Sequence, residues 1–305
     1  MRSVRLTKRS RTSFLTIALL FAVLIAASAA AQTAPSKWFA HRGFRGLHPE
    51  NTIEAMKRSL HFPSVVLEMD LAITKDKRVV ISHDAVLNPK LTLDSNGGEL
   101  DKTKKIALYN LAYNQLAQYD VGLKPNADFP GQARYKAHIP LFADLIDSVD
   151  RYAATAGLNP PVYFVETKLK PETDGKYHPC PEEFVDLTLD VIFDKGIQDR
   201  VIVQSFDPRT LQIIHKKYPN LPLAFLAKAG STIEQNIAWL GFTPTYYSAN
   251  SEAITRASMA ACKQLGMVAV AGDCKNYTVY LRLAKLGVQC FIADYPLEYL
   301  KKASP

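Results

Sequence analysis

The sequence predicts a closed (β/α)8 barrel on three observations. Eight short apolar segments alternate with helical segments along most of the chain, which is the order expected of repeated strand–helix units. Most of these segments are almost continuously apolar, as parallel strands buried on both faces are. A doubly wound sheet is the alternative, but it would normally carry a G-x-G-x-x-G turn after its first strand, and the sequence has none.

The predicted strands and helices follow each other along the whole chain after residue 36. The strands lie at residues 37–40, 65–70, 162–165, 201–203, 223–226, 246–248, 267–270 and 290–293. The helices lie at residues 53–60, 141–153, 182–194, from 208 onward, 232–240, 252–265 and 278–286. For the first helix we expect Asn51 as N-cap, with Glu54 as its partner in a capping box.

A β-hairpin is predicted beside the second strand. An apolar run leads into Glu68 and Asp70, which point to one face of a strand because they are two residues apart. A turn centred on Asp76 would pair this strand antiparallel with residues 79–81 and bring His83 level with both carboxylates. Carboxylates this close repel each other, and a divalent cation would relieve the repulsion. The alternative is an ordinary strand whose polar face lies in water.

Residues 85–139 do not fit a strand–helix unit. The segment is rich in turn signals such as Asn96-Gly97-Gly98 and Pro130-Gly131, with one short helix predicted near residues 110–118. We interpret it as a lid-like insertion into the barrel rather than as a separate domain.

Residues 1–31 predict a cleavable signal peptide. Five basic residues precede an apolar run at 14–27, and Ala29-Ala30-Ala31 offers an A-x-A cleavage site. The apolar run is short for a membrane span, although an uncleaved N-terminal anchor is the alternative. The sequence therefore predicts a periplasmic or secreted protein without stable membrane insertion, whose barrel domain covers residues 32–305.

Charge and cysteine content say little about partners. The net charge is +8, and the signal peptide carries five of the positive charges, which leaves about +3 (8 − 5). This excess is too small to predict binding to nucleic acid. The spacing of the four cysteines matches no metal motif, and the one disulfide considered joins Cys262 to Cys274. Cys290 lies in an apolar run and is expected to be a buried free thiol.

Polar residues end several of the predicted strands. A barrel would gather such residues at its carboxyl-terminal rim, where barrel enzymes carry out their chemistry. The residues are His41, Arg42, Glu68, Asp70, Glu166, Lys168, Gln204 and Asp294.

Seven short motifs, taken in order, resemble the glycerophosphodiester phosphodiesterase family. The resemblance runs from about residue 38 to residue 300. It implies a TIM-type barrel, a bound Ca²⁺ or Mg²⁺, and hydrolysis of small-molecule glycerophosphodiesters to sn-glycerol 3-phosphate and an alcohol, as in scavenging of phospholipid head groups. The motifs are His41-Arg42-Gly43, Pro49-Glu50-Asn51-Thr52, Glu68-x-Asp70, His83-Asp84, Glu166-x-Lys168, Gln204-Ser205-Phe206 and Asp294-Tyr295-Pro296.

The residue types suit the activity that the resemblance implies. An all-carboxylate set of Glu68, Asp70 and Glu166 favours Ca²⁺ or Mg²⁺ over Zn²⁺, and the ion would neutralise the charge of a phosphodiester. Arg42 could bind two phosphate oxygens at once, and Lys168 could add a point charge.

The same resemblance implies that His41 and His83 are the acid–base pair. Displacement at phosphorus needs a base on the nucleophile and an acid on the leaving alkoxide. We assign His41 as the base and His83 as the acid, and the reverse assignment stays open. Gln204 is assigned to the substrate, Phe206 to the wall of the pocket, and Glu50 is a further candidate for contact with metal or substrate.

One family segment is missing. The family commonly has W-T-x-N after its penultimate strand, where this chain reads Val268-Ala269-Val270-Ala271-Gly272-Asp273-Cys274. We therefore expect the alcohol or glycerol end of the pocket to differ.

Two other functions stay open. One is a lipid-directed phospholipase of the C or D type, against which the small charge and the polar insertion argue. The other is a non-catalytic binding protein, which would need neither histidine.

Overall fold

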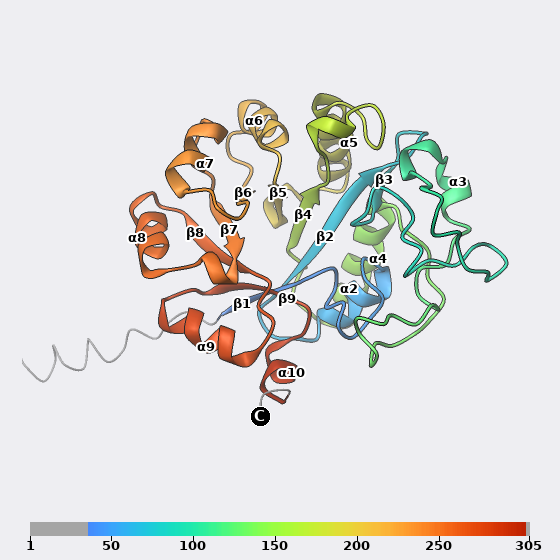
Figure 1. Ribbon diagram of the computed structural model, residues 1–305, viewed down its shortest axis with the longest axis horizontal. Helices are drawn as coiled ribbons and strands as arrows, with labels where there is room; N and C mark the ends of the chain where they lie inside the picture. Colours follow the sequence, from blue (N-terminus) through green and yellow to red (C-terminus); the bar gives the residue numbers. More distant parts are fainter. Residues whose placement is uncertain (1–35, 303–305) are drawn as a thin grey trace, which may run out of the picture. The chain divides into compact units, whose positions relative to one another are not determined.

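The computed structural model describes residues 36–302, so the predicted signal peptide and its cleavage site lie outside the described residues. Eight parallel strands close into a barrel, because β1 pairs with β2 on one side and with β9 on the other (Figure 1). The predicted (β/α)8 barrel is confirmed, and the doubly wound alternative is wrong. The strands are β1 (Lys37–Ala40), β2 (Val65–Ile73), β4 (Tyr163–Thr167), β5 (Val201–Ser205), β6 (Leu223–Leu226), β7 (Tyr246–Asn250), β8 (Val268–Gly272) and β9 (Cys290–Ala293).

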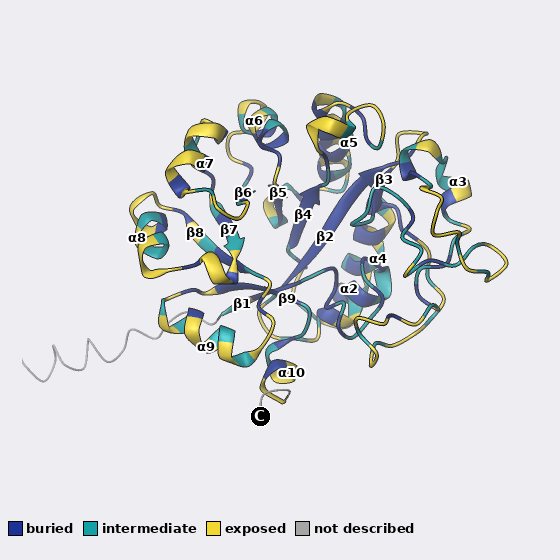
Figure 2. Ribbon diagram, viewed as in Figure 1, coloured by how far each residue is buried: buried dark blue, intermediate teal, exposed yellow. Residues whose placement is uncertain are grey.

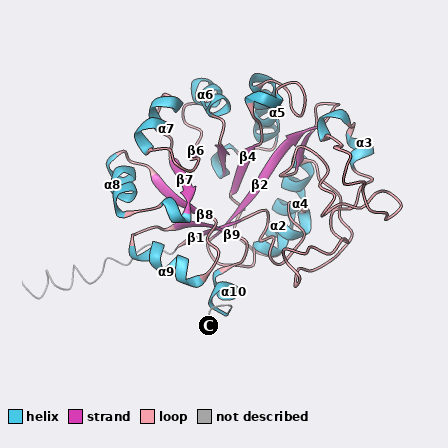
Figure 3. Ribbon diagram, in the orientation of Figure 1, coloured by secondary structure: helices cyan, strands magenta, loops and turns pink. Residues whose placement is uncertain are grey.

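A helix follows each barrel strand and packs outside the barrel (Figure 3). The order is α2 (Ile53–Ser59), α4 (Phe142–Thr155), α5 (Pro181–Asp194), α6 (Pro208–Lys217), α7 (Ile233–Leu240), α8 (Arg256–Gln264), α9 (Tyr277–Lys285) and α10 (Leu297–Lys302). Sequence patterns predicted all of these except α10. Short 3-10 turns η2 (Pro171–Thr173), η3 (Gln198–Arg200) and η4 (Ser251–Ala253) lie in the connections.

The barrel interior is filled near the starts of the strands by apolar side chains, and the strands are buried along most of their length (Figure 2). This interior cluster consists of Phe39, Val66, Phe164, Ile202, Ala224, Val270, Cys290 and Ile292, with Tyr246 packed against it. Side chains alternate along a strand, so the position two residues further on faces the same interior, closer to the carboxyl-terminal rim. In five strands that position holds His41, Glu68, Glu166, Gln204 or Asp294.

The hairpin extends β2 beyond the barrel. Strand β3 (Val79–Ile81) pairs antiparallel with β2, and Ile73 lies opposite Val79 while Leu71 lies opposite Ile81. These are the pairs that a turn centred on Asp76 predicts. The turn is held by Thr74, whose hydroxyl donates to the Asp76 carboxylate at 2.6 Å.

Residues 85–139 form a mostly irregular segment beside this hairpin (Figure 3). It contains only η1 (Leu108–Asn110) and α3 (Tyr113–Leu116), and a small apolar cluster that includes Leu87 and Val80 joins it to β3. The Asp120 carboxylate accepts backbone N–H groups at 2.7–3.1 Å from three residues of the segment. Gln132 donates to the backbone carbonyl of Arg45 at 2.6 Å, which ties the segment to the loop after β1.

One local expectation was wrong, and the one disulfide considered is not formed. Thr52, not Asn51, caps α2, because Asn51 has a left-handed backbone (φ 58°) and its side chain leaves the helix for the rim. The four cysteines are free, so Cys262 and Cys274 do not form a disulfide, whereas Cys290 is the buried thiol that was expected. Among residues 36–302 we find no helix with the length and apolarity of a membrane span.

The first prediction concerns the turn after β1, which needs glycine at residue 43. Gly43 has φ +81°, and a Cβ there would lie 2.8 Å from the Cβ of Ala55 in α2. Gly157 has a similar φ of +66° but open space around it. Gly43→Ala should therefore lower the free energy of unfolding by about 1–3 kcal/mol more than Gly157→Ala, the cost of the steric clash alone. Urea denaturation of both variants measures this difference, and equal losses would contradict it.

Candidate active site

Three carboxylates converge at the carboxyl-terminal rim of the barrel. Glu68 and Asp70 stand on β2, and Glu166 stands on β4, where it is the register partner of Asp70. All three are buried, and one oxygen from each lies within 4.8 Å of the others. Glu68 and Asp70 lie on one face of β2, as their spacing predicted, and together with Glu166 they could hold a metal ion.

Two cations lie against the carboxylates. The Arg42 guanidinium lies 3.4 Å from Asp70 and 2.9 Å from Glu50, while the Arg42 backbone N–H donates to Glu68 at 2.8 Å. The Lys168 ammonium lies 3.0 Å from Glu166 and 3.8 Å from Asp70. These contacts leave Glu68 as the one member of the trio without a cationic side chain within ion-pair distance in residues 36–302.

Burial and mutual repulsion shift the pKa values of the trio in different directions. Burial and the nearby Asp70 raise the pKa of Glu68 well above its usual value. Burial raises the pKa of Glu166 to about 7, although Lys168 opposes the shift. Burial also acts on Asp70, but Lys168 and Arg42 outweigh it and lower the pKa of this carboxyl. Negative charge is therefore concentrated on Asp70 when no further cation is present.

Two amide side chains complete the cluster. Asn51 donates to Asp70 at 2.9 Å, and Gln204 donates to Glu68 at 2.8 Å. The remaining oxygens of both amides are buried and accept no hydrogen bond from residues 36–302. Buried acceptors without donors, beside three carboxylates, form a set of hard oxygen ligands that fits Ca²⁺ or Mg²⁺. Asn51 escaped prediction because its place before a helix favoured a capping role.

His41 is oriented by an aspartate from the last strand. Its Nδ1 lies 2.6 Å from Asp294 Oδ1, which also accepts from Arg45 Nε at 2.7 Å. Burial would raise the pKa of Asp294, but the hydrogen bonds from His41 and Arg45 outweigh it and lower the pKa to about 2. An ionised Asp294 holds the proton of His41 on Nδ1, and so leaves Nε2 free to accept one.

His83 is oriented in the same way by its neighbour. Its Nδ1 lies 2.9 Å from Asp84, whose other oxygen accepts from Asn88 at 2.8 Å. The hydrogen bond with His83 lowers the pKa of Asp84, so this carboxylate stays ionised. Each of the two predicted histidines thus has an aspartate partner on Nδ1.

The backbone after β1 is held in a conformation that L-residues rarely adopt. Arg42, Gly43 and Phe44 have φ values of 51°, 81° and 53°, and the carbonyl of Arg42 accepts from the Asn51 N–H at 2.9 Å. Left-handed conformations of non-glycine residues cost of the order of 1 kcal/mol each. Here the turn directs the Arg42 N–H to Glu68, so the strained segment positions the site.

A cleft of about 990 Å³ opens from this site across the loops after β4 and β5. Its lining includes His83, Glu166 and Lys168 at one part, and Phe206, Lys228 and Trp239 at another. Phe206 is 39% exposed, which agrees with the wall position expected for it. Gln204 is buried among the carboxylates and does not line the cleft.

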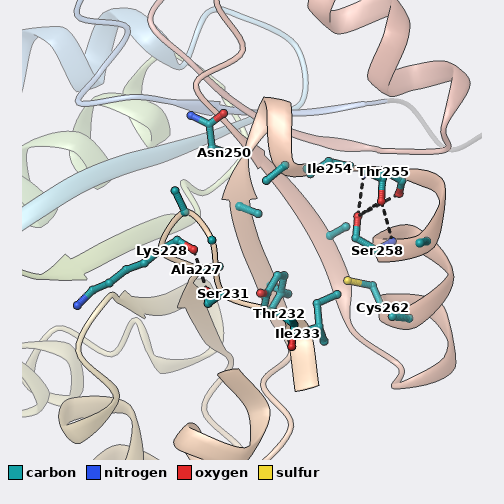
Figure 4. A pocket seen from close by; sticks show the side chains of 18 of the residues that line it. Ala227, Lys228, Ser231, Thr232, Ile233, Asn250, Ile254, Thr255, Ser258 and Cys262 are labelled. Atoms are coloured by element: carbon teal, nitrogen blue, oxygen red, sulfur yellow. Dashed lines mark hydrogen bonds between the residues drawn. The ribbon is translucent and has the colours of Figure 1, made fainter. Parts of the chain in front are cut away.

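A second cavity of about 370 Å³ lies outside the barrel between α7 and α8 (Figure 4). Its lining is mostly small apolar residues such as Ala261 and Ala269, and the Lys228 side chain extends away from it. None of the predicted site residues lines this cavity, so it is separate from the rim cluster.

The order and geometry of these residues agree with one family of known proteins. The chain matches the model of the glycerophosphoryl diester phosphodiesterase family over residues 41–298. The chain belongs to this family.

Individual relatives agree with the family match. The chain is 30% identical to a glycerophosphodiester phosphodiesterase of Bacillus altitudinis over 63% of this chain and 66% of that protein. It is 25% identical to one of Bacillus subtilis over 84% and 83% of the two chains. A solved glycerophosphoryl diester phosphodiesterase of Silicibacter pomeroyi, named putative, has a TM-score of 0.76 at 25% identity, covering 86% of this chain and 91% of that chain. An Oleispira antarctica phosphodiesterase solved with sn-glycerol-3-phosphate has the same fold, with a TM-score of 0.68 at 19% identity over 88% and 96% of the two chains.

The second prediction follows from repulsion among the three carboxylates. Glu68→Gln removes a carboxyl whose ionisation is opposed by burial and by the nearby Asp70, and the unpaired oxygen of Gln204 could accept the new amide hydrogen after an amide flip. In excess chelator at pH 8.5, the variant should unfold at a higher temperature than the parent protein. A relief of about 1 kcal/mol corresponds to about 2–4 °C. Calorimetry measures it, and the exposed Glu234→Gln is the matched control, expected to change little. A lower melting temperature for Glu68→Gln would contradict the prediction.

Proposed function

We propose that this protein hydrolyses glycerophosphodiesters to sn-glycerol 3-phosphate and an alcohol, with one divalent cation bound at the rim. The observation that carries the proposal is the buried trio of Glu68, Asp70 and Glu166 beside two aspartate-held histidines, in a chain of this family. The names of the Bacillus relatives support the reaction class. Product analysis on glycerophosphocholine and glycerophosphoethanolamine, with and without EDTA, tests it.

Glu68, Asp70 and Glu166 would hold the cation, which we propose to be Ca²⁺ or Mg²⁺. When bound, it would supply positive charge to the phosphate oxygens and so reduce repulsion of the nucleophile. Asn51 and Gln204 fix the rotamers of Asp70 and Glu68. Arg42 and Lys168 add fixed positive charge from the protein itself, next to the same carboxylates.

His41 would act as the base and His83 as the acid. The attacking hydroxyl, of water or of the substrate's own glycerol, gives its proton to Nε2 of His41 as it bonds to phosphorus. The bond from phosphorus to the alcohol oxygen breaks, and this oxygen takes a proton from His83. Attack by the glycerol hydroxyl gives a cyclic phosphate, which water then opens to sn-glycerol 3-phosphate with the two histidines in reversed roles. Asp294 and Asp84 keep the two rings in place, and each stabilises a positive charge on its own histidine.

We also propose that the protein is exported by means of residues 1–31. It then acts in the periplasm or outside the cell, on head-group diesters released from phospholipids. We further propose that residues 85–139 form a lid beside the site. The contacts of Gln132 with the carbonyls of Arg45 and His48 support the lid, because they join this segment to the loop that carries the site.

A lipid-directed activity is the second candidate. Over 62 residues, 20% of each chain, the sequence is 45% identical to a human lysophospholipase D. Release of choline from glycerophosphocholine but not from lysophosphatidylcholine would favour the first candidate, and the reverse would favour the second.

The third prediction concerns the cation. Excess EDTA should abolish turnover, and added Ca²⁺ or Mg²⁺ should restore it. The same ions should raise the melting temperature of the parent protein through binding to the folded state. Asp70→Asn should lose most of that increase, whereas Asp101→Asn, an exposed acid outside the site, should keep it. Full activity in EDTA would rule out the proposed role of the cation.

The fourth prediction separates the two histidines. His41→Ala and His83→Ala should each lower kcat by about 10²–10⁴, the usual contribution of one acid or base. Thermal shifts caused by the cation should persist, because neither ring is a proposed ligand. A nitrophenyl ester needs little protonation of its leaving group, so it should restore the rate of His83→Ala far more than that of His41→Ala. Restoration of His41→Ala instead would reverse the two roles.

A further inference from the structure

The cleft is larger than the reacting groups require. Its volume of about 990 Å³ lies at the upper end of the range for pockets that enclose whole drug-sized ligands, about 300–1,000 Å³. His83 lines the cleft together with Glu166 and Lys168. On the proposed mechanism His83 protonates the leaving alcohol, so the alcohol occupies the space on this side of the phosphate.

Aromatic side chains lie on the β5–β6 side of this cleft. Phe206 follows β5, and Trp239 on α7 is 51% exposed although it is large and apolar. Strand β8 ends in Gly272 and carries no aromatic side chain. Phe206 and Trp239 therefore supply aromatic surface on the β5–β6 side of the cleft.

Two lysines without acidic partners line the same cleft. The Lys228 ammonium lies 5.7 Å from the centre of the Trp239 ring. Lys170, two residues after Lys168, also lines the cleft. Neither Lys170 nor Lys228 has an acidic side chain within ion-pair distance in residues 36–302. Arg209, the other cation of the outer cleft, is neutralised by both Asp174 and Asp207.

Three of the four acidic side chains in the lining are engaged by groups other than these two lysines. Asp84 is bonded to His83, Asp207 to Arg209 and Glu166 to Lys168. Glu172 is the one lining carboxylate without a cationic partner among residues 36–302. What the outer cleft offers an anion is therefore not a net positive charge but two lysines that no carboxylate of residues 36–302 engages, Lys170 and Lys228.

We propose that the outer cleft is a specificity site for an alcohol that carries its own negative charge, such as a ring polyol bearing a phosphate. Phe206 and Trp239 contact the apolar face of the ring, and Lys170 and Lys228 bind its anionic group. The proposal rests on the proposed function, since it names the alcohol of that reaction.

The same arrangement disfavours amino alcohols. A quaternary ammonium such as choline binds proteins over an aromatic face. In this cleft the Lys228 ammonium already lies over Trp239, and a second cation there would be repelled. A phosphate group meets the opposite situation, because it gains a charge-assisted hydrogen bond from each lysine.

Turnover of three diesters that differ in the charge of the alcohol tests this. The substrates are glycerophosphoinositol 4-phosphate, glycerophosphoinositol and glycerophosphocholine. We expect kcat/KM to fall in that order. Lys228→Glu should lower kcat/KM for the first substrate about fivefold, the effect of one partly exposed ion pair, and raise it for the third. Trp239→Ala should lower kcat/KM for the two diesters with a ring alcohol, mainly by raising KM.

Lys263→Glu on α8 is the matched control, because it makes the same change in net charge on an exposed residue that does not line the cleft. It should leave the order and the ratios unchanged. A preference for glycerophosphocholine, or equal effects of Lys228→Glu and Lys263→Glu, would overturn the specificity proposal while leaving the hydrolase proposal intact. Hydrolysis of none of the three diesters would instead overturn the proposed function.

Discussion

Three buried carboxylates within 4.8 Å of one another are the constraint on which the rest of this site depends. Burial and like charge both oppose their ionisation, so each negative charge needs compensation from the protein or from a bound cation. Arg42 and Lys168 compensate Asp70 and Glu166 in part, and amide groups of the protein satisfy individual oxygens. Glu68 accepts hydrogen bonds, but no cationic side chain among residues 36–302 lies within ion-pair distance of it. The protein therefore builds a site that a divalent cation would stabilise.

The barrel makes this concentration of polar groups compatible with a stable fold. The amino-terminal part of its interior is filled by apolar side chains, and the polar groups begin two residues further along the same strands. Closure of the sheet by β1 and β9 brings His41 and Asp294 together although they are 253 residues apart in the chain. The left-handed backbone at Arg42 and Phe44, which costs conformational free energy, also lies at this rim, directly after β1. Each of these strands thus contributes apolar side chains to the core near its start and a polar side chain to the site at its end.

The loops around the rim differ in what they add. The loop after β1 supplies Arg42, Glu50 and Asn51, and the segment 85–139 packs against it. Loops after β4, β5 and β6 form the outer cleft, with Arg209 linking the first two through Asp174 and Asp207. The loop after β4 contributes to both parts of the site, because Lys168 lies beside the carboxylates and Lys170 lines the outer cleft.

The sequence by itself determined the barrel, the hairpin register and most members of the site, because strand alternation and motif order are local properties. The turn centred on Asp76 was enough to predict which residues of β2 and β3 lie opposite each other. Tertiary structure decided what local patterns could not express. Asn51 looked like a helix cap, but its left-handed backbone turns it to Asp70. Trp239 belongs to no motif of the sequence, and only the packing of α7 leaves it exposed beside Lys228. Side chains from distant parts of the chain acquire such roles through barrel closure, because closure fixes which loops become neighbours.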